Sequence, residues 1–334
     1  MNPDSTTYFN QLADDRDHVG FTLTNEQKVD YGWGAGKERP VYFVSPKPQG
    51  LFKHKNRSTG MASTLGKYAS SFSLGAKLLS KYYPAFAELL LQKSKQAYLK
   101  GMDNPGVSQT APGRAPYFYE EDNWTDDMQL AAMELYATFG NKNYLIQAVN
   151  YGRMEPVTPW MGADSARHYQ WYPFINIGHY HLAAQNIDMR VKQEFIRNMR
   201  SGLKRVKDRA CGDAFMNGIP FIWCSNNLTV GFITQCRLYH ELTGDADFLE
   251  IETAMRDWLF GCNPWGTSMI VGYPAYGDTP TSPHSAFTHL RQMPITGGIV
   301  DGPIYASIFG NLIGVHLSKE DAYAPVQSNY VVYH

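Results

Sequence analysis

Apolar residues recur at intervals of three and four along most of the chain from about residue 60 onward, which predicts paired amphipathic helices. The first pair spans residues 60–81 and 84–98, and its second helix opens with Pro84, which the first turn of a helix tolerates. The other pairs are predicted at residues 125–139 with 144–154, 172–184 with 189–209, and 226–242 with 246–260. The pattern therefore predicts an all-α fold.

A short motif recurs in the second and fourth pairs. Residues 138–145 and 242–249 share a turn glycine, then Asn or Asp, then an aromatic residue followed by Leu. Such recurrence is typical of stacked units, either in a solenoid or in a closed ring. Long aromatic-rich loops at one end of the pairs favour the ring, with the binding site on one face. Thr125 is predicted to be the N-cap of its helix.

The first 57 residues show no sustained helical period. Gly32, Gly34 and Gly36 precede Lys37, but their spacing is not that of a phosphate-binding loop. We expect residues 1–57 to be an extended connecting segment that pairs short strands or lies along a cleft. Residues 58–334 are expected to form the helical domain.

A long connection follows the last predicted helix, from about residue 266 to residue 310. Gly261 is expected in a left-handed conformation at the helix end, and Pro264 cannot continue a helix. The connection is rich in Gly, Pro, Ser, Thr and Tyr, but it carries too many apolar and aromatic residues to be disordered. We therefore predict a binding surface there, without helices of its own.

Composition and charge narrow the classes of molecule that the protein could bind. The 334 residues are 43% hydrophobic, which is enough for a large core, and the formal net charge is −1. Because no basic stripe occurs, nucleic acid and anionic membrane surfaces are poor partners. No apolar run approaches the roughly twenty residues of a membrane span, and the N-terminus does not resemble a signal peptide.

The four cysteines follow no zinc-binding spacing. They are expected to be buried thiols, and disulfide pairing cannot be inferred from the sequence.

Three tryptophans, Trp124, Trp171 and Trp223, stand where long connections enter helices. Flat aromatic rings stack on the apolar faces of sugar rings, so this placement favours a glycan-binding groove. The alternative is that the high aromatic content, 14%, serves the core.

The chain resembles the C-terminal half of a family-9 glycoside hydrolase, the cellulase type. The resemblance rests on residues 241–249, on Phe-Gly-Cys-Asn-Pro-Trp-Gly-Thr-Ser at 260–268, and on Pro283-His284, in that order. It implies an (α/α)6 toroid, here incomplete with about four of six helical pairs. It also implies a β-linked glycan as the partner and no cofactor beyond a structural calcium ion, which family members often bind.

The resemblance also implies a set of substrate-binding residues. Residues 124–128 are similar to the family's Tyr-x-Asp-Glu-Leu motif with Trp in place of Tyr, and Ser-Pro-His-Ser is similar to its Pro-His-His-Arg, with Ser285 and Ala286 replacing His and Arg. An acidic pair that usually follows the second tryptophan is missing, and Asn226-Asn227 stand where Arg is common. The implied set is Trp124, Trp171, Trp223, Asn227 and His284.

No catalytic residue is assigned. Inverting hydrolysis needs a carboxylate base and a carboxylic acid on opposite sides of the scissile bond. The family's Asp-Ala-Gly-Asp-like motif has no match, because residues 14–18 lack its glycine and tryptophan context, and no Asn-Glu-like motif follows residues 321–330, where the resemblance implies it. We therefore expect a fragment of a longer hydrolase with little or no activity of its own. The intact family member is expected to be extracellular or periplasmic.

An acidic run precedes and enters the helix at residue 125: Glu120, Glu121, Asp122, Asp126 and Asp127. It is compatible with a carboxylate pair or a calcium site. We interpret it as a solvated loop whose last two acids favour the helix dipole.

Two other functions remain open. One is a complete, non-catalytic glycan-binding helical protein. The other is an unrelated helical-ring enzyme such as a cyclase, which needs a metal or a carboxylate cluster.

Overall fold

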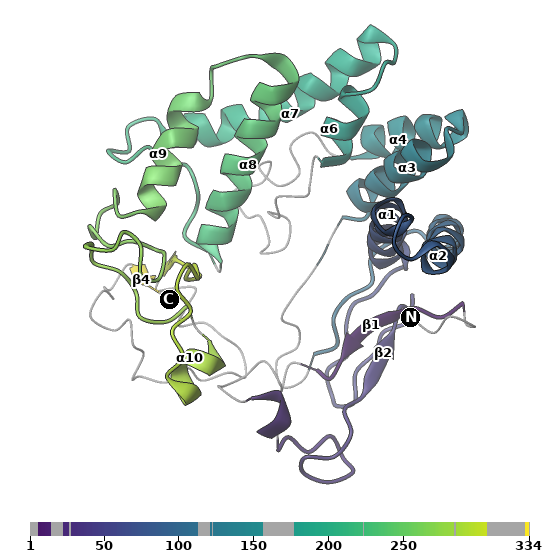
Figure 1. Ribbon diagram of the computed structural model, residues 1–334, viewed down its shortest axis with the longest axis horizontal. Coiled ribbons are helices and arrows are strands. Elements are labelled where there is room, and N and C mark those ends of the chain that lie inside the picture. The colour runs from purple at the N-terminus through teal and green to yellow at the C-terminus, as the bar shows by residue number, and fades with distance from the viewer. Residues whose placement is uncertain are drawn as a thin grey trace. The chain divides into compact units, whose positions relative to one another are not determined.

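The computed structural model describes residues 6–14, 23–26, 28–112, 121, 123–155, 177–222, 224–283, 285–305 and 331–333. Most of these residues are helical (Figure 1). The helices are α1 (Ala62–Leu79), α2 (Pro84–Asp103), α3 (Thr125–Phe139), α4 (Lys142–Met154), α6 (Ile177–Ala183), α7 (Met189–Ala210), α8 (Ser225–Thr243), α9 (Leu249–Leu259), α10 (Ala286–Arg291) and the 3₁₀ helix η1 (Thr24–Glu26). The strands are β1 (Phe9–Leu12), β2 (Val41–Phe43), β3 (Pro303–Tyr305) and β4 (Val331–Tyr333).

The chain divides into two compact units, and the division falls inside α7 after Ser201. The first unit contains β1, β2, the helices α1 to α4, α6 and the first part of α7. The second contains η1, the rest of α7, the helices α8 to α10, and β3 with β4. No helix in the described part of the chain is both long and apolar enough to cross a membrane.

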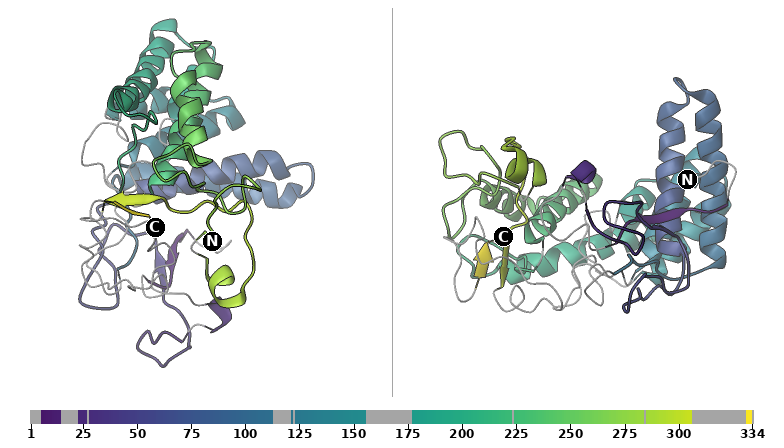
Figure 2. Two further views of the ribbon diagram at one scale, coloured as in Figure 1. Left: turned by 90° about the vertical axis from the view of Figure 1, so that its left-hand side faces the viewer. Right: turned by 90° about the horizontal axis from the view of Figure 1, so that it is seen from below.

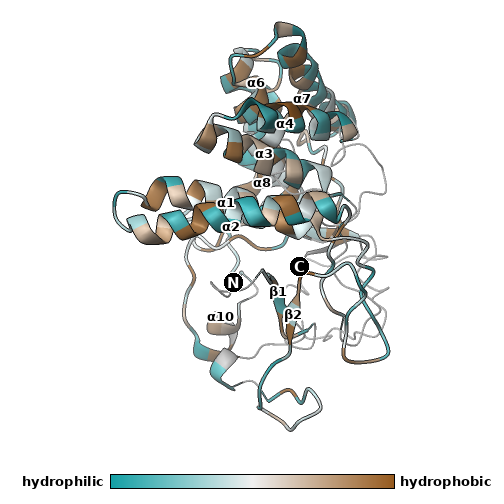
Figure 3. Cartoon of the chain, turned by 90° about the vertical axis from the view of Figure 1, so that its right-hand side faces the viewer, coloured by the Kyte–Doolittle hydropathy of each residue, from teal (hydrophilic) through white to brown (hydrophobic). Residues whose placement is uncertain are grey.

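The first helical pair forms as the hydrophobic pattern predicts. Figure 2 shows α1 and α2 running side by side, and Figure 3 shows apolar and polar positions alternating along both helices. Leu65 and Ala69 of α1, and Ala97 and Tyr98 of α2, are fully buried. Small side chains at two of these four positions allow the helices to approach closely.

Helix α1 also packs against the first turn of α3 at Gly66. A Cβ atom on Gly66 would lie 2.8 Å from the backbone carbonyl carbon of Asp127, which is too close for any side chain. Glycine at this position therefore brings the next residue of α1, Lys67, beside the carboxylate of Asp127.

The recurring turn predicted from the sequence is confirmed. Gly140 and Gly244 end α3 and α8 in the left-handed conformation, with φ of 64° and 73°. Their N–H groups donate to the carbonyls four residues earlier at 2.8 and 2.7 Å. The next residues, Asn141 and Asp245, each accept a backbone N–H from two residues further on with a side-chain oxygen. The same local chemistry thus joins the helices of both pairs.

The predicted N-cap of α3 is wrong. Thr125 is the first helical residue, Trp124 occupies the cap position, and no side chain of the cap residue bonds to the helix. Instead, Oδ1 of Asn123 accepts the Thr125 N–H at 3.1 Å. The Thr125 hydroxyl is engaged elsewhere, with Asn123 and Glu155.

The segment before residue 58 contains a pair of antiparallel strands, β1 and β2, in which Phe9 lies opposite Phe43. It is anchored on the first helical pair. Tyr8 is buried, and its hydroxyl donates to the Lys93 carbonyl of α2 at 2.9 Å.

The connection after α9 was predicted to have no helix, and this is wrong because it contains α10 and β3. Ser285 starts α10 by accepting the Phe287 N–H on its side chain at 3.3 Å. Gly261 has a φ of 108°, in the positive region that the sequence predicts. The expectation of four buried thiols is also wrong, because Cys211 and Cys262 are exposed.

Asn263 closes the turn that follows α9. Its Nδ2 donates to the carbonyls of Trp258 and Thr267, both at 2.8 Å, and its Oδ1 accepts the Trp265 N–H at 3.1 Å. Only 4% of Asn263 is exposed. One buried side chain therefore satisfies three backbone groups of this turn.

We expect Asn263→Ala to lower the free energy of unfolding by about 1 to 3 kcal/mol, because buried backbone groups lose their partners. Urea denaturation followed by circular dichroism measures this change. The exposed Asn186 supplies the matched control, and Asn186→Ala should change stability by less than about 0.5 kcal/mol. Equal stability of the two variants would contradict this role for Asn263.

Candidate functional site

The structure describes two of the five predicted binding residues. Trp124 lies in the first unit, at the start of α3, and Asn227 lies in the second, in the first turn of α8. Trp171, Trp223 and His284 lie outside the described residues. Their predicted roles stay predictions, and so does the gathering of all five on one face.

Trp124 is half-buried and lies against an aromatic residue of α4. Its ring meets that of Tyr151, from α4, edge to face, with centroids 5.9 Å apart and an angle of 76° between the planes. Such a contact orients the indole and leaves part of its surface open.

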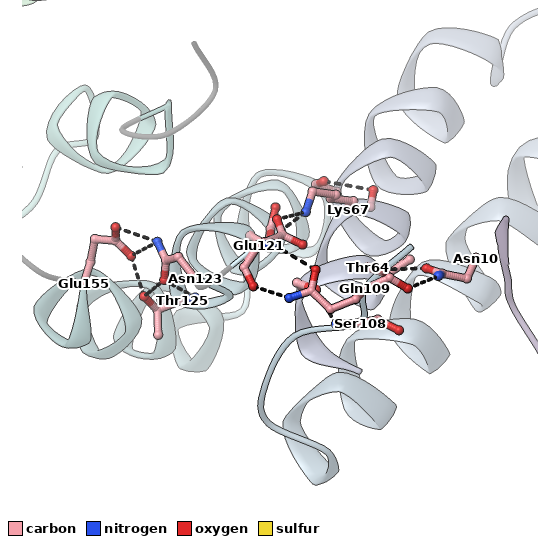
Figure 4. Close-up of polar contacts among 12 residues, drawn as sticks. Asn10, Thr64, Lys67, Ser108, Gln109, Glu121, Asn123, Thr125 and Glu155 are labelled. Carbon is pink, nitrogen blue, oxygen red and sulfur yellow. Dashed lines mark hydrogen bonds and ion pairs between the residues drawn. The ribbon is translucent and has the colours of Figure 1, made fainter. Parts of the chain in front are cut away.

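The residues on either side of Trp124 are fixed by a buried carboxyl group (Figure 4). Asn123 Nδ2 donates to both Oε1 and Oε2 of Glu155, each at 2.7 Å. The Thr125 hydroxyl makes a short hydrogen bond with Glu155 Oε2 and lies 3.0 Å from Asn123 Oδ1. Glu155 and Thr125 are only 4% and 6% exposed. We name Asn123, Thr125 and Glu155 the tryptophan base.

A second polar group fixes the segment before the tryptophan base (Figure 4). Lys67 of α1 forms an ion pair with Asp127 at 2.9 Å and a shorter one with Glu121. Gln109 donates from Nε2 to the Glu121 carbonyl at 2.6 Å and accepts the Glu121 N–H at 2.9 Å. Both the backbone and the side chain of Glu121 are thus held.

Burial dominates the electrostatics of these acids. It raises the pKa of Glu155 to about 8, with a further contribution from the charge of Asp126, and it raises the pKa of Asp126 to about 6. Burial likewise raises the pKa of Asp127. Although burial lowers the pKa of Lys67, the charges of Asp127 and Glu121 outweigh it and raise that pKa above its usual value. Each effect follows from the cost of holding a charge away from water.

Glu120 and Asp122 lie outside the described residues, but the other three acids of the run do not form the solvated loop that the sequence suggested. Asp126 and Asp127 do lie in the first turn of α3, as predicted, but Asp127 is buried and paired with Lys67. Helical periodicity places a residue on a face of its own helix, but it cannot show that Gly66 lets α1 approach this turn.

Sequence reasoning missed Glu155, Lys67 and Gln109. One signal was present for Glu155, which directly follows the last residue of a predicted helix. An acid at that end meets the negative end of the helix dipole and is unfavourable unless another group compensates. Asn123 and Thr125 provide that compensation.

Asn227 is half-buried, and its N–H donates to the Cys224 carbonyl at 3.0 Å. Its neighbour Asn226 has a clearer structural part, since it is fully buried and its Nδ2 donates to the Val300 carbonyl at 2.8 Å. Ser225 donates to the Pro303 carbonyl at 2.8 Å. The first turn of α8 therefore fixes the long connection before β3.

Part of the aromatic excess serves the core of the second unit. Trp258 is 1% exposed and packs with Phe221 and Trp265 at centroid distances of 6.3 and 6.2 Å. The alternative interpretation of the aromatic content thus holds for these rings.

No group of three or more His, Cys, Asp or Glu side chains suited to a metal ion occurs among the residues that the structure describes. The structural calcium ion stays a prediction from the resemblance.

Left-handed glycine turns of the same geometry join the helices of two pairs, which defines an all-α protein built from helical hairpins. The chain belongs to glycosyl hydrolase family 9, whose model matches residues 1–332. The family resemblance inferred from the motifs is confirmed.

Similar proteins agree with this assignment. The chain is 24% identical to the cellulose 1,4-β-cellobiosidase of Acetivibrio thermocellus over 306 residues, which cover 83% of this chain and 32% of that protein. Among solved structures, the family-9 endoglucanase J30 matches with a TM-score of 0.63 and 18% identity, covering 90% of this chain and 50% of that one. The cellulase Cel9M of C. cellulolyticum in complex with cellobiose matches with a TM-score of 0.60 and 17% identity, covering 90% and 66%.

The chain thus spans about a third of the length of the cellobiosidase and half of that of endoglucanase J30. The predicted fold class, that of the all-α (α/α)6 enzymes, is confirmed by the likeness to these structures.

Proposed function

We propose that this protein binds β-1,4-glucan and that Trp124 stacks on one of its sugar rings. The observation that carries the proposal is the tryptophan base, which fixes a half-buried indole within a chain of family 9. A similar protein is a cellulose cellobiosidase, and the Cel9M structure contains cellobiose, so a β-1,4-linked glucan is the substrate that these relatives support.

Sugar stacking suits this position physically. The axial C–H groups of a β-linked glucose form an apolar patch that matches the face of an indole. A ring held by its neighbours loses little conformational freedom when the sugar binds, so more of the contact energy appears as affinity.

Cleavage of the glucan with inversion would need one carboxylate to activate water and one carboxylic acid to protonate the leaving oxygen. The sequence has no Asp-Ala-Gly-Asp-like motif, and no Asn-Glu-like motif follows residues 321–330, although the family resemblance implies that these motifs supply the two groups. This chain by itself is therefore proposed to bind glucan with little or no cleavage. The place of action would be outside the cell or in the periplasm, where polymeric glucan is found.

Titration with cellohexaose tests the proposal. We expect the sugar to change the tryptophan fluorescence of the chain, and Trp124→Ala to weaken binding by about tenfold, corresponding to roughly 1.4 kcal/mol of lost stacking. Tyr82 is 75% exposed beyond the C-terminal end of α1, the end opposite to Gly66, and Tyr82→Ala is the matched control. A folded wild-type chain that shows no response to the sugar would refute the proposal.

A further inference from the structure

The last turn of α4 and the residue after it contact both the ring of Trp124 and the residues on either side of it. Glu155 directly follows α4, and its N–H donates to the Tyr151 carbonyl at 3.1 Å. The carboxyl group of Glu155 binds Asn123 and Thr125, while the ring of Tyr151 contacts the indole of Trp124. Any shift of this turn would move the supports on both sides of the tryptophan and the surface on which its ring rests.

The hydrogen-bond donors and acceptors around Glu155 indicate whether its carboxyl group is protonated. The Thr125 hydroxyl has one proton but two oxygen neighbours, Asn123 Oδ1 and Glu155 Oε2. The Asn123 amide is fixed, because its Oδ1 also accepts the Thr125 N–H and its Nδ2 therefore faces Glu155. One hydroxyl proton cannot serve both oxygens. If Glu155 Oε2 carries a proton, the carboxyl group donates to the Thr125 hydroxyl, and that hydroxyl donates to Asn123.

The surroundings of Glu155 agree with a neutral acid. The residue is 4% exposed, and among the described residues the charge of Asp126 acts on it. Both features disfavour a second negative charge, and they raise the pKa of Glu155 to about 8.

We propose that Glu155, as a neutral carboxylic acid, is a positioning residue that orients Trp124 for sugar stacking through Asn123 and Thr125. This inference rests on the proposed function, because it assigns a partner to the stacking residue. Glu155 takes no part in bond cleavage here: it holds the two residues that flank the tryptophan.

A double-mutant cycle on the full chain tests the positioning role. Cellohexaose affinity is measured for wild type, Trp124→Ala, Glu155→Ala and the double variant. We expect Glu155→Ala to weaken binding about tenfold, and the double variant to bind no more weakly than Trp124→Ala, because both changes remove the same contact. Additive losses would overturn the proposal, and so would unchanged affinity in Glu155→Ala.

Conservative variants separate positioning from a general loss of structure. Glu155→Gln keeps a neutral side chain that can donate to Thr125, and it should bind within about threefold of wild type. If Glu155→Ala does not fold, Thr125→Val replaces it, since it removes only the linking hydroxyl and should weaken binding about threefold. Glu88 is an exposed acid on α2, and Glu88→Ala is the matched control. If Glu155→Gln folds but does not bind cellohexaose, the proposal that Glu155 acts as a neutral acid is refuted.

A measurement without sugar distinguishes this inference from the proposed function. The chain has seven tryptophans, and 5-fluorotryptophan labelling with Trp124→Phe assigns the fluorine signal of Trp124. We expect this signal to shift in Glu155→Ala and to stay in place in Glu155→Gln. The fluorine signal could shift in Glu155→Ala although the wild-type chain binds no sugar. That result would support Glu155 as the residue that orients Trp124, but it would refute the glucan site. An unmoved signal in Glu155→Ala would refute the positioning role itself.

Discussion

Replacing Trp258 with alanine is expected to lower the free energy of unfolding by about 3 to 5 kcal/mol, because it leaves a large cavity in the core of the second unit. Trp258 is 1% exposed and packs with Leu259, Met269 and Val300. The half-buried rings of Phe221 and Trp265 cover the same cluster. Urea denaturation followed by circular dichroism measures the loss, and a loss below about 1 kcal/mol would contradict this packing.

Trp258→Phe is the matched control. The indole Nε1 of Trp258 is buried without a hydrogen-bond partner among the described residues. Phenylalanine removes this unpaired N–H, which stabilises the fold, but its smaller ring leaves some volume unfilled, which destabilises it. We expect this variant to lose less than half of what the alanine variant loses.

The second large effect is a fall in stability as the pH rises. The pKa of Glu155 is about 8 in the folded chain against an ordinary value of 4.5, chiefly because the group is buried. Between these values the folded chain binds more protons than the unfolded chain, so the free energy of unfolding decreases with pH. The stabilisation is complete below about pH 4.5 and is lost as the pH passes 8. Asp126, with a pKa raised to about 6, acts in the same direction.

We expect the wild-type chain to lose about 2 to 4 kcal/mol more than Glu155→Gln between pH 5 and pH 9. Glutamine cannot release a proton, so that variant should keep only the contributions of Asp126 and Asp127. Denaturation curves at several pH values measure the difference. Parallel stability profiles for the two proteins would show that the Glu155 carboxyl group is already ionised at pH 5.

The sequence predicted the helical pairs well because their apolar faces are buried within each pair. α3 spans the predicted residues 125–139, and the predicted turn glycines, Gly140 and Gly244, end their helices. These features depend on residues only a few positions apart. The same local signals could not predict α10, a short helix inside a connection rich in glycine and proline.

The chemistry around Trp124 could be predicted only in part. The tryptophan itself was identified from its place before a helix and from the family motif. Its supports come from separate segments, with Lys67 on α1 and Glu155 after α4. No spacing in the sequence relates these positions, and the buried state of Asp127 depends on the approach of α1 at Gly66. Long-range packing therefore determines which acids are charged.

Saturation-transfer NMR with cellohexaose and the full chain tests the stacking of a sugar on Trp124 most directly. The prediction is strong transfer to the axial C–H hydrogens of a glucose ring in wild type, with most of that transfer lost in Trp124→Ala and retained in Tyr82→Ala. Equal transfer in wild type and Trp124→Ala, both folded, would contradict the assignment of Trp124 as a sugar platform.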